Sequence, residues 1–494
     1  MTTAAARHAA VNPSLQSTAV SSPGGVIRLM ENHDGALRIW REAGVRDRIL
    51  VHIDAHHDMW WLESDDGLSI ANFLCAALKE QIVRELYWVV PDATWQTRAG
   101  RAALRRHLRK LQERYPGECA PAVWGERRIS TELMKRRLVI CSLDTFPPPT
   151  DPVLLDIDVD YLTIPRVSYG EWDTHSLLPW RWPDELVRLL VAKRVSSDLV
   201  TISYSVEGGH TPLEWKYLGD ELAARLGDAE MLLLHAYVAM RQGAAAARAG
   251  EHATAESAFT AVGDRVGAAP YFWLAHMLVD QGRADEAREW HTRALLADPS
   301  YRNAYPLGMT LYFEKSDQAE MAFERSLVLE PANAYAQLGL GWIAADRKRW
   351  QHAEELARKA LVLSPTLIDA YRLLARALEE QARLDEAIAA YEQSLRLALA
   401  GHRPYNAVIT SAEQTQRLLD CDHPRVHARL GRLYRRKGLR DRAIVAYRMA
   451  IAGGCDIPAV RFDLAWLCAR QRRWRDAARH AACAIMSTSE RYRR

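Results

Sequence analysis

Residues 49–58 read Ile-Leu-Val-His-Ile-Asp-Ala-His-His-Asp, an apolar run that ends in carboxylate and imidazole side chains. If the run is a strand, its two-residue period places Asp54, His56 and Asp58 on one side of the extended backbone. Two carboxylates and an imidazole at the end of a buried strand repel one another or stay unsolvated unless a positive charge lies among them. The stretch therefore predicts a strand that ends in a divalent-metal site.

A second acidic block, Asp156-Ile157-Asp158-Val159-Asp160, follows the apolar residues 153–155. Three like charges on one strand face are unfavourable alone, because each carboxylate raises the pKa of the next. The alternatives are a loop of solvated acids and an aspartate that caps a helix. The interleaved Ile157 and Val159 favour a buried strand. Two blocks of this kind predict a metal site more strongly than either does alone.

Two further stretches place polar side chains after strand-like runs. Glu31-Asn32-His33-Asp34 follows the run at 26–30, and Glu207-Gly208-Gly209-His210 follows the run at 199–206. Paired glycines allow a tight turn or a close backbone approach. Open α/β sheets bind their ligands at the C-terminal ends of their strands. This rule favours a role for His33 and Glu207 beside the two acidic blocks.

At these residues the chain resembles a known group of hydrolases. The stretch 54–58 resembles the DAHxD motif of the arginase–deacetylase superfamily, and 157–162 resembles its second motif, an apolar residue followed by DVDxL. Residues 24–228 are similar to an arginase-like family best known from peptide arginases. That resemblance implies an α/β fold, a three-layer α/β/α domain with a mainly parallel sheet. It also implies conversion of arginine residues in a peptide or protein to ornithine, with release of urea.

The resemblance further implies a site for two metal ions, usually Mn²⁺. One ion would be held by His33 and Asp58, the other by His56 and Asp160, with Asp54 and Asp158 bridging the pair. Asp156 would become a ligand if the register of the second block shifts by two residues. Mixed aspartate and histidine ligands without a thiolate suit Mn²⁺ better than a structural zinc ion.

Substrate and proton-transfer roles follow from the same comparison. A guanidinium is a planar, permanent cation that calls for a carboxylate in fork geometry, and Glu207 is placed for that role. Asn72 is a second expected substrate-binding residue, and His210 joins Glu207 as an expected catalytic group. The proton-shuttling histidine of arginases has no counterpart in residues 68–73, so His57, His175 and His210 remain alternatives.

Two other functions stay open at this point. The same metal chemistry serves hydrolysis of a free guanidino compound or of an acylated amine. A non-enzymatic alternative is a repeat scaffold whose N-terminal domain keeps a metal for stability only. The complete set of acids argues against a purely structural role, because a site without catalytic activity would not need so many like charges close together.

The second half of the chain has a different pattern. Alanines recur at spacings of 32, 32, 34, 34, 56 and 34 residues: Ala255, Ala287, Ala319, Ala353, Ala387, Ala443 and Ala477. A 34-residue period is typical of tetratricopeptide repeats, in which pairs of antiparallel helices stack. Residues 229–494 therefore resemble an all-α tetratricopeptide solenoid of six or seven units, with an insertion near residues 400–423. Such a solenoid is expected to hold a peptide or protein, here the substrate.

Composition agrees with two domains and excludes several classes. A chain of 494 residues is too long for one core. No apolar run is long enough to span a bilayer, residues 1–16 lack the features of a secretory signal, and residues 1–23 are expected to be disordered. Seven scattered cysteines predict reduced thiols and a cytoplasmic location. The basic runs 105–110 and 435–437 are expected to coat exposed helix faces, without nucleic-acid binding.

Overall fold

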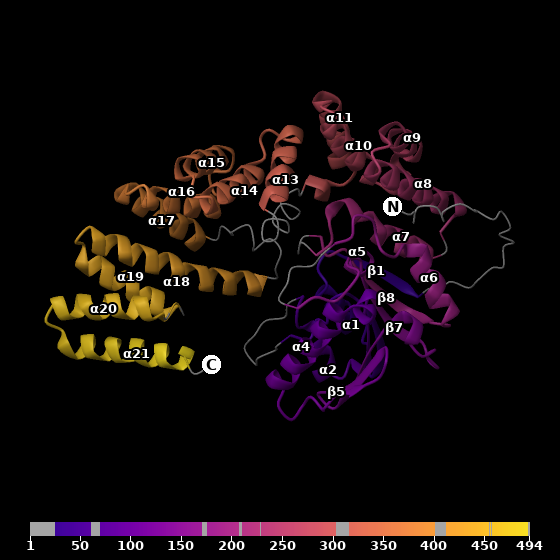
Figure 1. Ribbon diagram of the computed structural model, residues 1–494, viewed down its shortest axis with the longest axis horizontal. Coiled ribbons are helices and arrows are strands. Elements are labelled where there is room, and N and C mark those ends of the chain that lie inside the picture. The colour runs from indigo at the N-terminus through magenta and orange to yellow at the C-terminus, as the bar shows by residue number, and fades with distance from the viewer. Residues whose placement is uncertain are drawn as a thin grey trace, which may run out of the picture.

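The computed structural model of the protein describes residues 25–60, 70–169, 175–206, 210–227, 229–302, 316–400, 412–453, 455 and 457–492. The chain forms a sheet flanked by helices and then a long arc of helices (Figure 1). In Figure 1 the sheet domain lies at the right, and the arc curves from above it to the C-terminus at the left.

Eight strands of the described residues form one sheet, in the order β1-β8-β7-β2-β3-β6-β5-β4. In this order, all neighbouring strands from β1 as far as β6 are parallel. At the other edge, β5 pairs antiparallel with β6, and β4 pairs antiparallel with β5. The predicted α/β class with a mainly parallel sheet is confirmed. The strands are β1 (Val26–Met30), β2 (Arg48–Ile53), β3 (Val83–Val89), β4 (Val123–Trp124), β5 (Arg128–Leu133), β6 (Arg136–Cys141), β7 (Val153–Asp158) and β8 (Ser197–Ser203).

Helices cover both faces of this sheet, which makes three layers. Successive strand residues such as Leu50 and Val51 point to opposite faces and belong to two separate apolar cores. Helices α1 (Gly35–Glu42), α2 (Phe73–Lys79) and α4 (Arg98–Arg114) pack on the face of Leu50, and α6 (Pro183–Ala192) and α7 (Tyr217–Leu226) on that of Val51. Short helices complete the domain: α3 (Ala93–Gln96), α5 (Asp160–Thr163), η1 (Leu143–Thr145) and η2 (Leu213–Trp215).

The neighbouring strands β2 and β7 mark the point where the chain changes direction across the sheet. From β2 the chain moves to β3 on one side, whereas from β7 it moves to β8 on the other. In open α/β sheets, the loops that leave such a pair diverge and open a crevice at the carboxyl ends of the strands. Both acidic blocks of the sequence lie at this crevice.

The arc consists of antiparallel helix pairs. Its described helices are α8 (Met231–Arg248), α9 (His252–Val262), η3 (Gly263–Val266), α10 (Ala269–Asp280), α11 (Ala284–Ala297), η4 (Pro299–Arg302), α13 (Ser316–Leu329), α14 (Ala334–Asp346), α15 (Trp350–Leu363), α16 (Ile368–Glu380), α17 (Leu384–Leu399), α18 (Ala412–Arg436), α19 (Arg440–Ala452), α20 (Pro458–Arg470) and α21 (Trp474–Tyr492). The predicted insertion falls partly on residues 401–411, outside the described residues.

The recurring alanines lie where the helices of a pair approach most closely. Six of the seven, Ala255 through Ala443, are completely buried, and Ala477 is partly buried. Glycine serves the same purpose on the facing helix: a Cβ added to Gly341 would lie 2.5 Å from the side chain of Leu373. Small side chains at a 34-residue period are thus explained by helix packing.

The first two helix pairs of the arc share a core with the sheet domain. One continuous apolar cluster contains Ile157 of β7, Leu222 of α7, Phe259 of α9 and Trp273 of α10. The indole of Trp273 packs against Trp215 at 5.2 Å between ring centroids and donates a hydrogen bond to the carbonyl of Glu214. Helices α8–α11 therefore form part of the same folded body as the sheet.

A buried lysine strengthens this junction. The Nζ of Lys216, which precedes α7, donates to Asp298 Oδ2 at 2.7 Å and to the hydroxyl of Ser300, both after α11. The same ammonium lies 5.0 Å from the ring of Tyr204 and 5.5 Å from that of Tyr301. A partly desolvated cation–π interaction adds to the ion pair. Lys216 therefore links the segment after β8 to the helical arc.

Candidate metal centre

The expected metal ligands converge at the carboxyl ends of β1, β2 and β7. His33 lies between β1 and α1, and Asp158 and Asp160 lie at the end of β7 and the start of α5. The remaining three follow β2. All but His56 are buried, and all line one pocket of about 130 Å³: His33, Asp54, His56, Asp58, Asp158 and Asp160.

The loop after β2 orients its side chains differently from the expected strand. Strand β2 ends at Ile53, so the alternation that sequence reasoning assigned to Asp54, His56 and Asp58 is not that of a pleated strand. The backbone N–H of His56 instead donates to Asp54 Oδ1 at 2.6 Å, and Asp58 adopts a left-handed conformation with φ of 47°. A tight turn, held by the carboxylate of Asp54, directs the three side chains into the pocket.

The first cluster surrounds the Nδ1 atom of His33. This nitrogen lies 3.1 Å from Asp54 Oδ2, 3.1 Å from Asp58 Oδ2 and 3.0 Å from Asp158 Oδ2. Around an octahedral ion with bonds of about 2.1 Å, neighbouring ligand atoms are roughly 3.0 Å apart. Each of the three carboxylate oxygens thus lies at the distance from His33 Nδ1 that is expected for two neighbouring ligands of one ion.

The second cluster lies on the other side of Asp54. His56 Nδ1 is 2.8 Å from Asp160 Oδ2 and 3.5 Å from Asp54 Oδ1. Ligand atoms of Asp54, Asp158 and Asp160 all lie within 4.8 Å of one another, and His210 joins His56 and Asp160 within the same limit. Asp54 and Asp158 belong to both clusters, which is the arrangement that bridging ligands require.

Asp156 lies one layer deeper, behind the expected ligands. Strand register aligns it with His52 of β2 and Thr201 of β8. Its Oδ2 is 2.8 Å from His33 Nε2 and 2.8 Å from His52 Nδ1, and its Oδ1 accepts from the Thr201 hydroxyl at 2.5 Å. A carboxylate behind a ligating imidazole fixes the tautomer and orientation of the ring. The pocket lining includes Asp158 and Asp160 but not Asp156.

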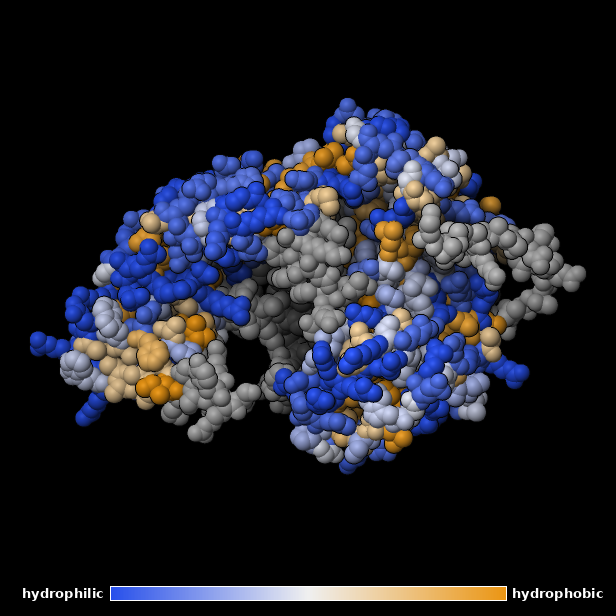
Figure 2. All heavy atoms as spheres, in the orientation of Figure 1, coloured by the Kyte–Doolittle hydropathy of each residue, from blue (hydrophilic) through white to orange (hydrophobic). Residues whose placement is uncertain are grey.

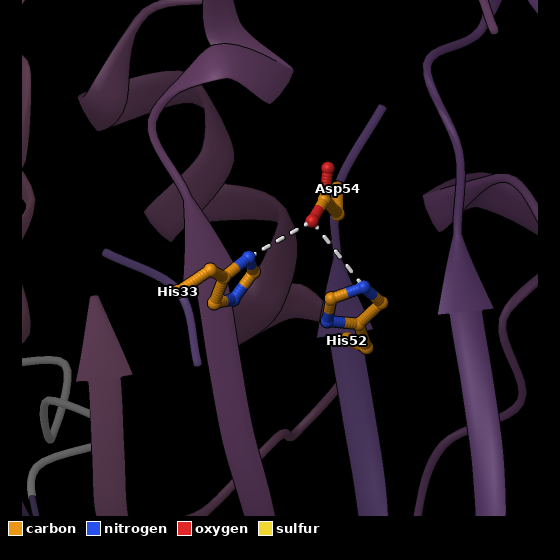
Figure 3. Close-up of side chains that lie close together, drawn as sticks. All are labelled: His33, His52 and Asp54. Atoms are coloured by element: carbon orange, nitrogen blue, oxygen red, sulfur yellow. Dashed lines mark ion pairs between the residues drawn. The ribbon is translucent and has the colours of Figure 1, made fainter. Parts of the chain in front are cut away.

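Several atoms that face the clusters are buried and form no hydrogen bond among the described residues: His33 Nδ1, His52 Nε2, Asp54 Oδ2 and Asp160 Oδ1. Of these, His33 Nδ1 and His52 Nε2 lie within ion-pair distance of Asp54 Oδ2. Figure 3 shows three of these residues, with both imidazoles turned toward Asp54. Buried polar atoms are rarely left unpaired, because each costs free energy. A divalent cation satisfies carboxylate oxygens and imidazole nitrogens together, so the residues present fit such an ion.

Charge and burial shift the pKa of the clustered groups in opposite directions at His33 and Asp54, and both raise it at Asp58 and Asp160. Burial opposes the charged imidazolium of His33, but Asp156 and Asp158 outweigh it and raise its pKa well above the ordinary value. Burial raises the pKa of Asp58 and Asp160, and their acidic neighbours raise it further. Asp54 behaves differently: burial is outweighed by His33 and His56, and its pKa falls well below normal. Without a cation, the centre therefore retains protons.

Metal binding is expected to release these protons. Ligation requires deprotonated carboxylates and a neutral imidazole, whereas the raised pKa values of His33, Asp58 and Asp160 favour their protonated forms. Because each of the three groups must lose its proton before it binds the ion, Mn²⁺ affinity should rise with pH. Calorimetric titration in two buffers of different ionisation enthalpy should show proton release. An affinity that does not change between acid and neutral pH would contradict this assignment.

Only some of the other expected site residues line the pocket. Asn72 is buried at the N-terminus of α2 and does not line the pocket, whereas its neighbour Ala71 does. Glu207 lies outside the described residues. Among the alternative histidines, His57 and His210 line the pocket, whereas His175 does not and instead contacts the Thr163 hydroxyl at 3.2 Å.

His57 is enclosed by aromatic rings. It packs against His107 at 4.6 Å and Trp60 at 4.8 Å between ring centroids. Burial, with His107 and His56 nearby, lowers its pKa well below the ordinary value. Its Nδ1 accepts from the backbone N–H of Met59 at 2.9 Å, so the neutral ring carries its proton on Nε2.

Sequence reasoning missed several residues that support the centre. His52 is completely buried, and its only signal was an isolated histidine in an apolar strand. Ser205 donates to Asp158 Oδ2 at 2.5 Å and has a left-handed φ of 52°. Glu31 Oε1 accepts from the backbone N–H of Val206 at 2.9 Å and holds the loop after β8 to the loop after β1.

Comparison with known families concerns the helical arc. Models described as tetratricopeptide repeat match residues 268–301, 311–368 and 368–400. The C-terminal region contains tetratricopeptide repeats. Repeats of this kind suggest a protein-interaction scaffold, and they commonly bind peptides or proteins. No curated protein matches the chain. No helix in the described part of the chain has the length and apolar character needed to cross a membrane.

Solved structures with similarity to the chain include other repeat proteins. MamA has 20% identity and a TM-score of 0.31, covering 38% of this chain and 98% of its own. The pilF protein of Pseudomonas aeruginosa has 18% identity and a TM-score of 0.32, covering 46% and 91%. YrrB, a TPR protein with an unusual peptide-binding site, has 15% identity and a TM-score of 0.30, covering 40% and 92%.

Proposed function

We propose that the protein is a binuclear metal hydrolase that converts arginine residues of a peptide or protein to ornithine and releases urea. The convergence of six carboxylate and imidazole ligands into two clusters that share Asp54 and Asp158 carries this proposal. The resemblance of residues 54–58 and 157–162 to arginase-like motifs supplies the reaction class.

The residues present define what each part of the site would do. His33, Asp54, Asp58 and Asp158 would hold one Mn²⁺, and Asp54, His56, Asp158 and Asp160 the other. When bound, the two ions would acidify a water molecule and stabilise the negative charge that develops on attack at a guanidinium carbon. Asp156 and His52 would hold His33 in the tautomer that presents Nδ1 to the pocket. His57 and His210, which both line the pocket, are the two candidates for proton transfer.

Three features support a peptide or protein substrate. The chain carries tetratricopeptide repeats, whose concave surfaces suit peptides and proteins. The repeats are joined to the sheet domain through a shared core. The space-filling view shows an opening between the C-terminal repeats and the sheet domain (Figure 2). A docking array adds nothing for free arginine but raises the local concentration of a bound peptide.

The direct test is a mass measurement on defined substrates. Full-length protein reconstituted with Mn²⁺ is incubated separately with an arginine-containing peptide, with free arginine and with an acylated lysine peptide. We expect each converted peptide residue to lose CH₂N₂, with urea as the second product and slower turnover of free arginine. Conversion of free arginine alone would favour the free guanidino alternative, and deacetylation of an acylated lysine peptide would favour the acylated-amine alternative.

The glutamate expected to recognise the guanidinium gives a second test. Glu207→Gln keeps the shape of the side chain but removes its charge, and loss of a charged partner in a dry site costs about 1.5–3 kcal/mol. We expect kcat/KM to fall by roughly 10–150-fold with metal content unchanged. Loss of metal in this variant would show instead that Glu207 is a ligand.

A repeat scaffold with a structural metal is the second function, and the repeat matches favour it. It predicts bound metal with no turnover of any arginine or acyl-lysine peptide. It also predicts that metal removal lowers thermal stability without changing any catalysed reaction.

A further inference from the structure

A second cavity lies on helix α4, on a different side from the metal pocket. It has a volume of about 590 Å³, and its lining includes Trp95, Arg101, Arg105, Arg109 and Trp124. The same helix contributes His107 to the metal pocket. One face of α4 thus belongs to the metal centre, and another forms the wall of this arginine groove.

The arginines of the groove are four residues apart, so they form one row along the helix. A rise of 1.5 Å per residue spaces such side chains by about 6 Å. None of the three forms an ion pair with an acidic side chain in the described part of the chain; Arg101 donates to the carbonyl of Trp95, and the guanidinium of Arg105 lies 5.4 Å from the Trp124 ring. Glu126 is the one acidic residue of the lining. The row therefore has positive charge available for a ligand.

The opposite wall is an exposed sheet edge. Strand β4 is the last strand of the sheet, with no strand on its outer side among the described residues. The side chain of Trp124 lines the groove and is 43% exposed, whereas Val123 is 71% exposed but does not line it. An edge strand with exposed apolar residues is suited to an extended segment of another chain.

We propose that this arginine groove binds an extended peptide segment with acidic side chains at alternate positions. Alternate residues of an extended chain lie about 6.6 Å apart on the same side, which matches the spacing of the arginines. Carboxylates facing Arg101, Arg105 and Arg109 would leave the intervening residues against the wall that contains Trp124. Arginine pairs with carboxylates through two parallel hydrogen bonds, which favours this ligand over a neutral one. The inference stands whether or not the metal centre is catalytic.

The test uses the full-length protein and fluorescein-labelled peptides in anisotropy titrations. One probe alternates glutamate with valine, a second has the same composition with its glutamates contiguous, and a third alternates lysine with valine. We expect the first to bind most tightly and the third not to bind. Arg105→Gln and Arg109→Gln should each weaken the first probe by about fivefold, the upper range for an exposed ion pair.

Arg106→Gln is the matched control, because Arg106 is exposed on the same helix but does not line the groove. It should leave affinity within about twofold of wild type, and all variants should keep their metal content and thermal midpoint. Equal losses in Arg105→Gln and Arg106→Gln would overturn the proposal, since binding would then follow overall charge. Tighter, groove-dependent binding of a short oligothymidylate would overturn it in favour of a nucleic-acid site.

Discussion

Asp54→Asn is expected to remove both divalent ions from the protein and to abolish turnover of arginine peptides. Asp54 approaches His33 with one carboxylate oxygen and His56 with the other, at 3.1 Å and 3.5 Å. Asparagine keeps the size of the side chain but replaces one anionic oxygen with an amide that cannot bridge. The loss should exceed the 10–100-fold decrease in metal affinity that is typical of residues behind the ligands. Elemental analysis after Mn²⁺ reconstitution measures it.

Three variants provide controls for this result. Asp158→Asn should behave like Asp54→Asn, because Asp158 also faces both clusters. His33→Ala should weaken mainly one ion, and Asp156→Asn should lower affinity by about 10–100-fold while leaving both positions fillable at high Mn²⁺. Two ions retained in Asp54→Asn would contradict the bridging role, and less than one ion per wild-type chain would contradict the binuclear site.

A fragment that ends at residue 228 is expected to lack a cooperative thermal transition. The cut removes Met240, Phe259 and Trp273, which are almost completely buried in the core shared with the sheet. Loss of one large buried side chain typically costs about 2–5 kcal/mol, and a whole domain is stable by only about 5–15 kcal/mol. Removing three together should unfold the sheet domain, and differential scanning calorimetry with size-exclusion chromatography would detect this.

A fragment that ends at residue 302 is the matched control. It keeps α8–α11 and the Lys216–Asp298 pair, and it ends before residues 303–315, which lie outside the described part of the chain. We expect it to melt cooperatively and to retain its metal. A stable, metal-binding fragment ending at residue 228 would instead show that the repeats are dispensable for the fold of the sheet.

The repeat array and the class of the sheet domain were predictable because both depend on periodicity. Alanines that recur every 34 residues must meet neighbouring helices, and apolar runs bounded by turns must form buried strands. The shared core was not predictable in this way. Side chains such as Trp215 and Trp273 lie 58 residues apart in the sequence, and each also fits its own domain as a core residue.

The convergence of the six expected ligands was predictable from the sequence, but the residues that support them were not. Asp156, Asp158 and Asp160 have the same local pattern, and only the pairing of β7 with β2 and β8 places Asp156 beside His52 and Thr201. The contact between His52 and Asp156 depends entirely on that strand register. Asp58 and Ser205, both in the left-handed region, likewise contact residues at or just after the ends of other strands, His33 and Asp158 respectively.

The contacts of Lys216 help to hold helices α8–α11 at a fixed distance from the sheet. Because α8–α11 are packed onto the sheet, a peptide held by the early repeats would start at a set distance from the metal pocket. A flexible linker would let many spacings reach the pocket at similar effective concentration, whereas a rigid junction favours one. Under the proposed function, the position of the modified arginine would then be selected by its distance along the peptide from the docked segment, in the manner of a ruler.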